Sequence, residues 1–404
     1  MSSESKPAVI PPGSTIGILG SGQLGKMMAI QAKHMGYRVH ILSPGLDTPA
    51  GQVADLEVQA SFTDLDAIDA FARRVSVVTV ETENIPLPTL ETAGEICPAY
   101  PGRSALEVCQ NRLKEKQFLG DSSVPTCEYR IVNSRDELRQ ACDELMPGIL
   151  KTTTGGYDGK GQFKIQSPDD IEPAWEAIGG ENLILEQFID YDFEFSVVGV
   201  RNSAGVMTAY SSIRNEHVNG ILDVSISPGG LPADQESAAR EICFEIMSRL
   251  DSVGVLTIEF FRKQDEIYVN EMAPRPHNSG HLTIEGHVTC QFEQHIRAIC
   301  GMAPGSTRQH QPVAMANLLG QVWQDGQNPH WHLALEVPDT KLHLYGKEEP
   351  RKDRKMGHLT SLAESVEQAQ GNVVSARKLL NSDVAGDSTD QPAAGSEQES
   401  SLSR

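Results

Sequence analysis

Short, mostly apolar runs alternate with segments of helical periodicity along the first part of the chain. Residues 24–35 and 64–73 place apolar side chains at helical spacing on one face. The runs beside them lack polar alternation, which is typical of parallel strands that are buried on both faces. These runs lie at residues 15–19, 37–42 and 76–80. The alternation of strand and helix predicts an N-terminal Rossmann-like β/α domain over residues 13–120.

Beyond Pro125 the pattern changes to strands, a hairpin and one long helix. We expect the helix at residues 238–250 and the hairpin at residues 256–272. Further strands are predicted at residues 148–151, 162–165, 182–188, 313–319 and 342–346. The whole pattern predicts a protein of mixed α/β and α+β class. Its expected divisions are a central domain over residues 121–305, whose first lobe spans about 125–205, and a small C-terminal domain over 306–380.

The two ends of the chain differ from the rest in composition. From Asn381 to Arg404 the sequence is polar, lacks aromatic residues and holds five acids against one Arg. Such a segment buries too little apolar surface to offset the entropy of ordering. We therefore expect residues 1–12 and the acidic tail, residues 381–404, to be disordered.

Composition and charge exclude several classes of protein. The chain has 404 residues, enough for two or three domains. Its 55 acidic and 34 basic residues give a net charge of −21, which argues against nucleic acid or an anionic membrane as a partner. No run approaches the ~18 apolar residues of a membrane helix, and the N-terminus lacks the apolar core of a secretory signal. Seven scattered cysteines without a Cys-x-x-Cys motif fit a reducing cytoplasm.

A first glycine-rich loop joins the first predicted strand to the first predicted helix. It reads Gly20-Ser21-Gly22-Gln23-Leu24-Gly25 and matches the pattern G-x-G-x-x-G. Free N–H groups at a helix N-terminus attract phosphate. A nicotinamide dinucleotide would also need an acid at the end of the second strand, where this chain has Ser43-Pro44. We expect the phosphate of another ligand here, with a tight turn that binds no ligand as the alternative.

A second glycine-rich loop follows the strand that ends at Lys151. Residues 155–162 hold four glycines with Asp158 and Lys160, and no Gly-Lys-Ser/Thr helix follows, so this is not a Walker loop. A flexible glycine hairpin with N–H donors can close over a polyphosphate as a lid. We favour this interpretation over a mobile surface hairpin.

The predicted hairpin carries two acids, Glu259 and Glu271. If its turn centres on Asp265, the two face each other, with Cβ atoms about 5 Å apart. Two such carboxylates repel each other unless a cation neutralises them. Mg²⁺ with oxygen ligands, which Asn270 could supplement, is the natural occupant and would bridge to nucleotide phosphates. A solvated face with exposed acids is the alternative.

Two polar segments follow the hairpin. Residues 273–281 form a rigid loop that carries Arg275, His277 and His281. Residues 345–358 form a basic cluster, with five Lys or Arg within nine residues of a very acidic chain. This contrast favours capture of an anion over a merely solvated turn.

Together these motifs resemble the ATP-grasp superfamily, which combines a β/α domain, a lid with a glycine loop and paired acidic metal ligands. More narrowly, the sequence is similar to the 5-(carboxyamino)imidazole ribonucleotide synthases, the ATP-dependent carboxylases of purine biosynthesis. The similarity runs from about Thr15 to about Leu359, and it implies an ATP-grasp fold for the central domain with its lid at about 125–205. Its most specific elements are residues 20–25, 155–162, 270–281 and 354–358. One departure is Thr82, which stands where the family often has an aromatic residue between two acids.

The resemblance implies a nucleotide site in the central domain. Arg112 and Lys151 would contact the ATP phosphates, Glu194 would bind the ribose hydroxyls and His217 would add a further contact. The lid residues over the phosphates would be Gly156, Tyr157, Asp158, Gly159, Lys160, Gly161 and Gln162. The adenine hinge would be Glu186, Gln187, Phe188 and Ile189, and the contacts on the hairpin would be Asn270 and Glu271. Glu259 and Glu271 would hold one or two Mg²⁺ ions, for which Mn²⁺ could substitute.

The resemblance also implies a second site, for 5-aminoimidazole ribonucleotide, between the N-terminal and C-terminal parts. The first glycine loop, Lys347 and Arg354 would hold its phosphate, with Glu81 and Asn84 near the imidazole. The loop residues implied are Gly22, Gln23 and Leu24. The catalytic residues implied are Arg275, His277 and Asn278, toward bicarbonate and ribonucleotide, with Tyr157 capping the site.

The predicted activity is therefore ATP- and bicarbonate-dependent carboxylation of the aminoimidazole amine through carboxyphosphate, by a cytoplasmic homodimer. The nearest alternative is the ATP-grasp formyltransferase that acts on glycinamide ribonucleotide. The sequence His277-Asn278-Ser279-Gly280-His281 and the later Lys355-Met356-Gly357-His358 favour the carboxylase. A nicotinamide oxidoreductase is disfavoured by the missing ribose acid. A non-catalytic nucleotide sensor is disfavoured because Lys151, Glu259 and Glu271 are present.

Overall fold

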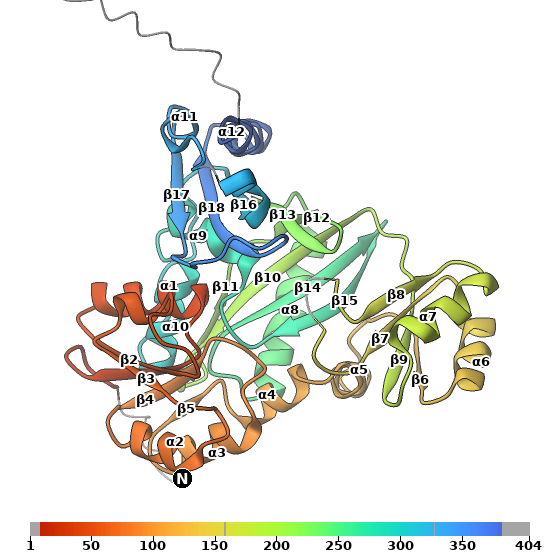
Figure 1. Cartoon of the computed structure of the whole chain (residues 1–404), viewed down its shortest axis with the longest axis horizontal. Helices are drawn as coiled ribbons and strands as arrows, with labels where there is room; N and C mark the ends of the chain where they lie inside the picture. Colours follow the sequence, from red (N-terminus) through yellow and green to blue (C-terminus); the bar gives the residue numbers. More distant parts are fainter. Residues whose placement is uncertain (1–8, 157–158, 327, 382–404) are drawn as a thin grey trace, which may run out of the picture.

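Three β-sheets form the frame of the molecule (Figure 1). The computed structural model describes residues 9–156, 159–326 and 328–381. The N-terminal part is a parallel sheet in the order β3-β2-β1-β4-β5. Its strands are β1 (Thr15–Leu19), β2 (Arg38–Ser43), β3 (Leu56–Gln59), β4 (Val77–Val80) and β5 (Ala99–Tyr100). Its helices are α1 (Gln23–His34), α2 (Leu65–Ala72), α3 (Leu87–Gly94) and α4 (Arg103–Cys109).

Both faces of this sheet are covered, which explains the continuous apolar runs. Ile16 and Ile18 of β1 pack with Met28 of α1 on one face. Val78 and Val80 of β4 pack in a second core on the other face. The predicted β/α architecture of this part is therefore confirmed.

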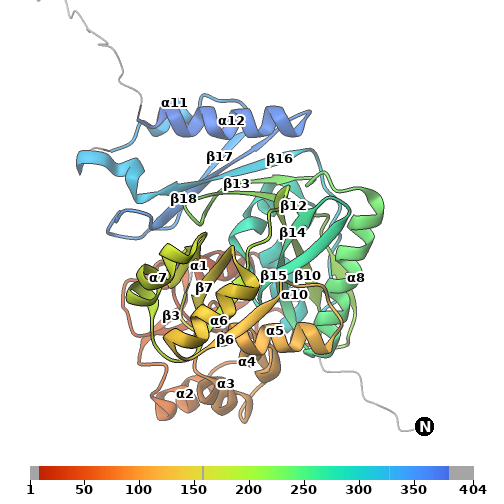
Figure 2. The same cartoon turned by 90° about the vertical axis from the view of Figure 1, so that its right-hand side faces the viewer.

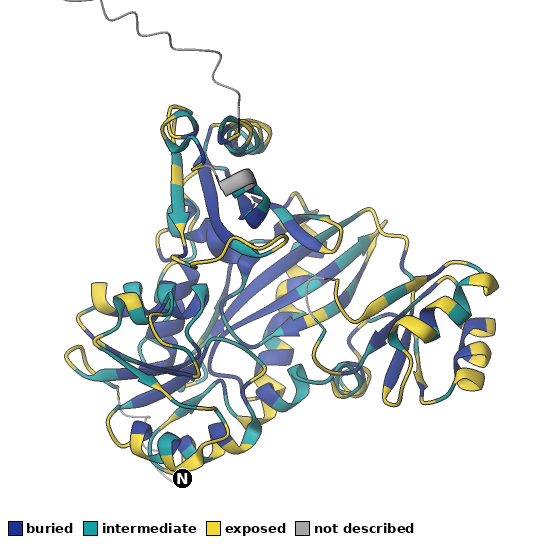
Figure 3. Ribbon diagram, in the orientation of Figure 1, coloured by how far each residue is buried: buried dark blue, intermediate teal, exposed yellow. Residues whose placement is uncertain are grey.

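A four-stranded antiparallel sheet forms the lobe at the right of Figure 1, in the order β6-β9-β7-β8. Its elements are β6 (Tyr129–Val132), α6 (Arg135–Leu145), β7 (Gly148–Thr152), β8 (Gln162–Ile165), α7 (Ile171–Ile178) and β9 (Leu183–Gln187). Leu138, Leu150 and Leu185 lie in its small core. Figure 3 shows the outer surfaces of α6 and α7 largely exposed, while Leu138 of α6 and Ala174 of α7 pack against the sheet.

A nine-stranded sheet forms the centre of the molecule, in the order β15-β14-β10-β12-β13-β16-β18-β17, with β11 beside β10. Its central strands are β10 (Phe193–Arg201), β11 (Met207–Ala209), β12 (Ile213–Val218), β13 (Ile221–Ser227), β14 (Gly254–Lys263) and β15 (Glu266–Ala273). Its C-terminal strands are β16 (Val313–Leu319), β17 (Thr340–Leu344) and β18 (Lys355–Leu362). The helices here are α5 (Arg112–Asp121), α8 (Ala233–Arg249), α9 (Thr283–Gly286), α10 (Gln291–Ile299), α11 (Trp331–Ala334) and α12 (Val366–Leu379).

The C-terminal strands continue the central sheet, because β13 pairs directly with β16. Figure 2 shows α12 lying over these strands, and its Ala369 and Val373 pack with Ala314 and Ala316. A single sheet thus crosses the boundary that we expect near residue 305. The domain boundaries themselves stay predictions.

Most expected elements form close to their predicted bounds, and two differences stand out. The helix expected at 238–250 begins earlier, at Ala233, and its first turn holds Asp234 and Glu236, which suit a helix N-terminus. Residues 9–12, expected to be disordered, are held in place by Ile10. Its N–H donates to the Cys300 carbonyl (3.0 Å) and its carbonyl accepts from the Tyr37 hydroxyl (2.7 Å). Asn381, the first residue of the expected disordered tail, forms a turn after α12, where its N–H donates to the Lys378 carbonyl (3.3 Å). The other residues expected to be disordered, 1–8 and 382–404, lie outside the described ranges.

Candidate active site

The first glycine loop and Glu81 meet at the carboxyl ends of β1 and β4. These neighbouring strands flank the point where the strand order of the sheet reverses, which is the usual ligand position in such sheets. The Glu81 carboxylate accepts hydrogen bonds from the N–H groups of Gly22 (2.5 Å) and Gly25 (2.6 Å). A Cβ on Gly20 would lie only 2.2 Å from the Glu81 side chain. These glycines therefore make room for Glu81.

This geometry reduces the number of N–H donors that the loop could offer to a phosphate, and phosphate binding by the loop stays a prediction. Two of its N–H donors already bind an internal carboxylate at the N-terminus of α1. Burial raises the pKa of the Glu81 carboxyl, while the two N–H groups and the charges of Arg275 and Lys347 oppose that rise. Glu81 is thus a half-buried carboxyl group that orders the loop. The sequence pattern did not reveal this, because the acid lies far along the chain from the glycines.

A buried network of charges links the lobe to the central sheet. The Lys151 ammonium lies 2.5 Å from the Glu186 carboxylate, and Lys116 lies 3.7 Å from the same group. All three side chains are buried. Burial alone would raise the pKa of Glu186, but the charges of Lys116 and Lys151 outweigh it and lower that pKa to about 2. The predicted phosphate lysine and the first hinge residue are therefore neighbours.

The second glycine loop contacts α5 and the turn between β12 and β13. Arg112 donates to the carbonyls of Thr152 and Gly156, both at 3.0 Å. A Cβ on Gly159 would lie 3.2 Å from the Asn219 carbonyl, and Gly159 and Gly161 have φ values of +76° and +68° that favour glycine. The loop is therefore folded beside Arg112, and its role as a lid stays a prediction. Tyr157 and Asp158 lie outside the described residues.

Glu194 and His217 form the next predicted pair, on adjacent strands. Their Oε2 and Nδ1 atoms are 2.6 Å apart, and the Tyr191 hydroxyl also donates to Glu194. Burial lowers the pKa of His217, but its bond to Glu194 and the charge of Glu259 outweigh burial and raise that pKa. The pair thus favours the protonated form of the imidazole beside the proposed ribose contact, Glu194.

The two acids of the hairpin face each other as predicted: Glu259 pairs with Glu271 across β14 and β15. Glu259 is largely buried, while Glu271 is exposed rather than buried as its apolar neighbours suggested. Burial and the nearby charge of Glu271 raise the pKa of Glu259. A bare pair of this kind fits a divalent cation with oxygen ligands. Within the described residues no larger group of His, Cys, Asp and Glu is arranged to hold a metal ion.

The loop after the hairpin is held by partly buried polar contacts. Arg275 forms a two-pronged ion pair with Glu83, at 2.5 and 3.1 Å. His277 Nδ1 contacts the Ser279 hydroxyl at 2.9 Å and lies 3.7 Å from Glu259. Burial, together with the charges of Arg275 and Lys355, holds the pKa of His277 well below its usual range. His277 is therefore a neutral imidazole near the acidic pair.

Asn278, predicted to face substrate, has its amide engaged elsewhere. Its Nδ2 donates to Asn317 Oδ1 (3.1 Å), and Asn317 Nδ2 donates back to Asn278 Oδ1 (2.7 Å). This reciprocal pair ties the loop to β16. The structure therefore places Asn278 as a structural link between loop and sheet.

The remaining predicted residues are placed as follows. The Lys347 ammonium donates to the Lys355 carbonyl (2.7 Å), and Arg354 donates to the Glu349 carbonyl (2.9 Å), so both belong to the basic segment before β18. Asn84 is exposed, and its side chain bonds only weakly to Thr82, at 3.5 Å. The hinge residues Gln187 and Phe188 bond through their N–H groups to the carbonyls of Glu128 and Pro147, and Ile189 is buried.

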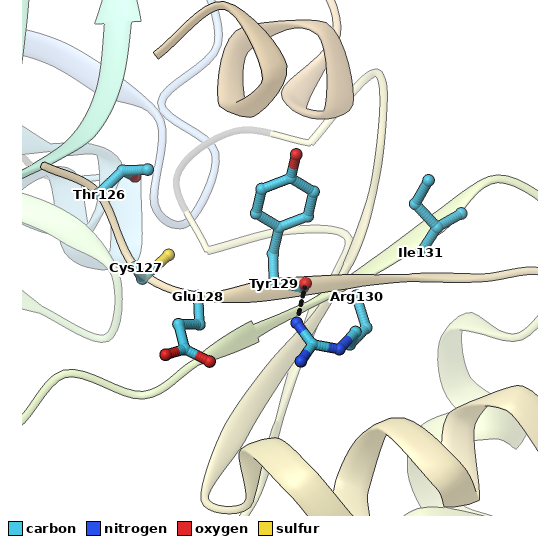
Figure 4. A pocket seen from close by; sticks show the side chains of 6 residues that line it. All are labelled: Thr126, Cys127, Glu128, Tyr129, Arg130 and Ile131. Carbon is cyan, nitrogen blue, oxygen red and sulfur yellow. Dashed lines mark hydrogen bonds between the residues drawn. The ribbon is translucent and has the colours of Figure 1, made fainter. Parts of the chain in front are cut away.

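A wide, open pocket of about 600 Å³ lies beside this hinge, lined by residues 126–131. Figure 4 shows Tyr129 on one side of the chain and Glu128 and Arg130 on the other. Its six lining residues include none of the predicted site residues. The Glu128 carbonyl, however, accepts from Gln187, which places the pocket against the predicted adenine hinge.

Several residues of the site were missed from the sequence: Glu83, Glu115, Lys116, Gln291 and Asn317. Gln291 of α10 exchanges two hydrogen bonds with the backbone of His277, at 2.9 and 2.7 Å. Glu115 and Lys116 follow Arg112 at helical spacing on α5, which is the signal that could have found them. Gln291 and Asn317 carry no such signal because their partners lie on distant segments.

Comparison with known protein families matches the N-terminal, central and C-terminal parts of the chain to three families. Residues 14–110 match the ribonucleotide synthetase preATP-grasp domain, residues 117–292 the ATP-grasp domain, and residues 313–372 the phosphoribosylaminoimidazole carboxylase C-terminal domain. No helix in the described part of the chain is long and apolar enough to span a membrane.

The relatives agree with this assignment. The N5-carboxyaminoimidazole ribonucleotide synthase of Bacillus subtilis is 41% identical over 355 residues, which cover 87% of this chain and 92% of that protein. The bifunctional purine synthesis protein purC/E of Dictyostelium discoideum is 40% identical, and the match covers 87% of this chain but only 37% of that longer protein. The synthase of Aspergillus clavatus, solved with ADP and 5-aminoimidazole ribonucleotide, superposes with a TM-score of 0.83 at 30% identity, over 91% of this chain and 98% of that one. The chain therefore belongs to the N5-carboxyaminoimidazole ribonucleotide synthase family of ATP-grasp proteins.

Proposed function

We propose that this protein carboxylates the amine of 5-aminoimidazole ribonucleotide, using ATP and bicarbonate. A bicarbonate oxygen attacks the γ-phosphorus of ATP, the bond to the β–γ bridging oxygen breaks, and carboxyphosphate and ADP form. The amine nitrogen then bonds to the carboxyl carbon, either directly or after release of CO₂. Inorganic phosphate leaves, the amine loses a proton, and 5-(carboxyamino)imidazole ribonucleotide results.

The observation that carries this proposal is the grouping of charges around α5. Arg112 lies at the glycine loop, and Lys151 contacts Glu186. Lys116 bonds to the backbone beside Glu271 and faces Glu186 as well. Transfer of a phosphoryl group depends mainly on positioning and on cations that offset its negative charge, so no covalent nucleophile is needed. The lid would shield carboxyphosphate from water.

The acids of the hairpin fit the proposed Mg²⁺. Glu259 and Glu271 would hold one or two ions, with Asn270 as a further oxygen donor, and Mn²⁺ could substitute. When bound, the cation supplies positive charge that stabilises the transferring phosphoryl group. Since the pKa of Glu259 is raised, part of the Glu259 population is protonated near neutral pH, and binding of a cation would release that proton.

The second substrate is assigned to the N-terminal and C-terminal parts. Lys347 and Arg354 are proposed to hold its phosphate, since two N–H donors of the first glycine loop are taken up by Glu81. Gln23 and Leu24 remain proposed contacts of the ribonucleotide. Arg275 is proposed to attract bicarbonate. His277 is neutral and its Nδ1 accepts from the Ser279 N–H (3.4 Å), so we propose that its Nε2–H donates a hydrogen bond to the substrates. The amine proton leaves with the departing inorganic phosphate.

Release of ADP tests the proposal. Purified protein with Mg·ATP and bicarbonate should release ADP faster when 5-aminoimidazole ribonucleotide is added, and Glu271→Gln should abolish the increase. Stimulation by formate and glycinamide ribonucleotide instead would assign the protein to the alternative formyltransferase. Tight binding of ATP with neither stimulation would leave a nucleotide sensor and refute the proposed reaction.

We also propose that the protein acts as a homodimer in the cytoplasm. The seven cysteines are all free thiols, which suits a reducing compartment. Size-exclusion chromatography with light scattering measures the mass: about 88 kDa would support the dimer and 44.0 kDa would refute it.

A further inference from the structure

The predicted metal carboxylate Glu271 lies on the edge strand of the central sheet. β15 pairs with β14 and ends the strand order, and its outer side carries an isolated bridge between Val269 and Thr126 in place of a further strand. Next to Glu271 the register shifts by one residue, so Asn270 has no partner on β14. Edge strands leave backbone N–H and C=O groups without a ladder, and bulges loosen the strand further. The backbone around Glu271 therefore needs other partners to keep one conformation.

Two consecutive side chains of α5 supply these partners. The Glu115 carboxylate accepts from the N–H of Met272 at 2.5 Å, and the Lys116 ammonium donates to the carbonyl of Asn270 at 3.0 Å. The two bonds hold the residues on either side of Glu271. Glu115 is 4% exposed and Lys116 is 1% exposed, so water does not compete for either group.

The same helix, α5, connects these two hydrogen bonds to the rest of the proposed nucleotide site. Lys116 also donates to Thr126 (2.9 Å), whose hydroxyl donates to the Val269 carbonyl (2.8 Å) of the same strand. It faces Glu186, the partner of Lys151, across 3.7 Å. Any rotation of α5 would thus move the strand of Glu271 and the contacts of the lobe together.

From these contacts we infer that Glu115 and Lys116 are positioning residues. They fix the backbone on both sides of Glu271 and so orient its carboxylate to bind the cation. The inference rests on the proposed function, because it assumes that Glu271 binds a divalent cation. A purely structural role would predict loss of stability alone. A positioning role predicts loss of the contribution that the metal makes to nucleotide binding, because residues that orient metal ligands typically control metal affinity by about 10- to 100-fold.

Calorimetric titration with ADP separates the two roles. The dissociation constant of ADP is measured with saturating Mg²⁺ and again in EDTA, and the ratio of the two values gives the gain from the metal. In Glu115→Ala we expect this gain to fall about tenfold, with little change in the affinity measured in EDTA. Glu115→Gln keeps an acceptor oxygen for Met272 and should restore most of the gain. If Glu115→Ala does not fold, Lys116→Met, judged by the same ratio, replaces it.

Glu236→Ala is the matched control. Glu236 lies on α8 and also accepts from a backbone N–H, that of Ser212, at 2.7 Å. Its loss should leave the gain from Mg²⁺ unchanged. An unchanged gain in folded Glu115→Ala or Lys116→Met would overturn the inference while the proposed function stands. Absence of any gain from Mg²⁺ in the wild type would overturn both.

Discussion

Removal of the Glu81 carboxylate tests whether the first glycine loop is ordered from within. Glu81→Ala deletes two hydrogen bonds to the N–H groups of Gly22 and Gly25. Bonds to charged groups contribute about 1.5–3 kcal/mol each, so the upper limit is about 3–6 kcal/mol. The cost of burying the carboxylate, visible as its raised pKa, offsets part of this. Water can also enter the vacated space. A net loss of about 2–3 kcal/mol follows.

Thermal unfolding provides the assay. For a domain of 150–250 residues such a loss lowers the Tm by roughly 4–12 °C. Glu81→Gln keeps the size of the side chain and one acceptor oxygen, so its Tm should fall about half as far. Glu81→Ala also frees two N–H donors at the N-terminus of α1, where an anion can bind. Inorganic phosphate at ten times its Kd should then restore about 1.4 kcal/mol in Glu81→Ala and nothing in the wild type.

Two results would refute this reasoning. A Glu81→Ala protein as stable as the wild type would mean that the two hydrogen bonds contribute nothing. Equal stabilisation of wild type and variant by phosphate would mean that the loop binds phosphate with Glu81 in place, as the sequence pattern first suggested.

Three further predictions concern the site. Burial raises the pKa of Glu259, and the charge of Glu271 raises it further. A carboxyl with a raised pKa destabilises the folded state above its ordinary pKa. Glu271→Gln removes the contribution of the second charge, so this variant should melt about 2–4 °C higher than wild type at pH 8 in EDTA. His217 has a raised pKa in the folded protein, so its pair with Glu194 contributes its full stability below about pH 6.5, and this contribution is lost as the pH rises through the raised pKa. The Tm difference between wild type and His217→Gln should therefore shrink from pH 6 to pH 9. A Tm difference that stays constant would contradict this. Gln291→Leu frees the backbone of His277 and should lower kcat roughly 10- to 100-fold with little change in the KM for ATP. Gln294→Leu, which breaks the matching pair of bonds from the same helix to Gly305, should leave kcat unchanged.

The acidic hairpin shows what the sequence pattern can predict and what it cannot. Counting symmetrically about Asp265 predicts that Glu259 faces Glu271, and the structure agrees. The ladder from Lys263 and Glu266, however, centres between Gln264 and Asp265, and the bulge near Glu259 restores the expected pairing. The prediction was correct, although the simple count omits the bulge. Bulges depend on the partner strand and on outside contacts, so periodicity alone does not locate them.

Local sequence patterns predicted the helices and strands, whereas contacts between distant segments determine which partner each polar group binds. The parallel strands and α1 follow from apolar periodicity, which depends on near neighbours. The N–H groups of the first glycine loop bind Glu81, and the backbone beside Glu271 is held by α5. Both partners lie far away along the chain. The partner of Asn278, which we predict to face substrate, is likewise distant along the chain, since Asn317 lies on β16. Residue type and spacing indicated the chemistry here, but not which partner each polar group would find.

The continuity of the nine-stranded sheet bears on how this protein can be divided. β13 is an interior strand only because β16 pairs with it. A fragment that stops near residue 305 would expose the backbone of Val224, Ser225 and Ile226 along a new edge, together with the apolar surface that α12 covers. Such edges recruit strands from other molecules. The C-terminal segment is therefore a part of the sheet that protects the ATP-grasp domain from self-association, and it is not a module that can be removed or exchanged on its own.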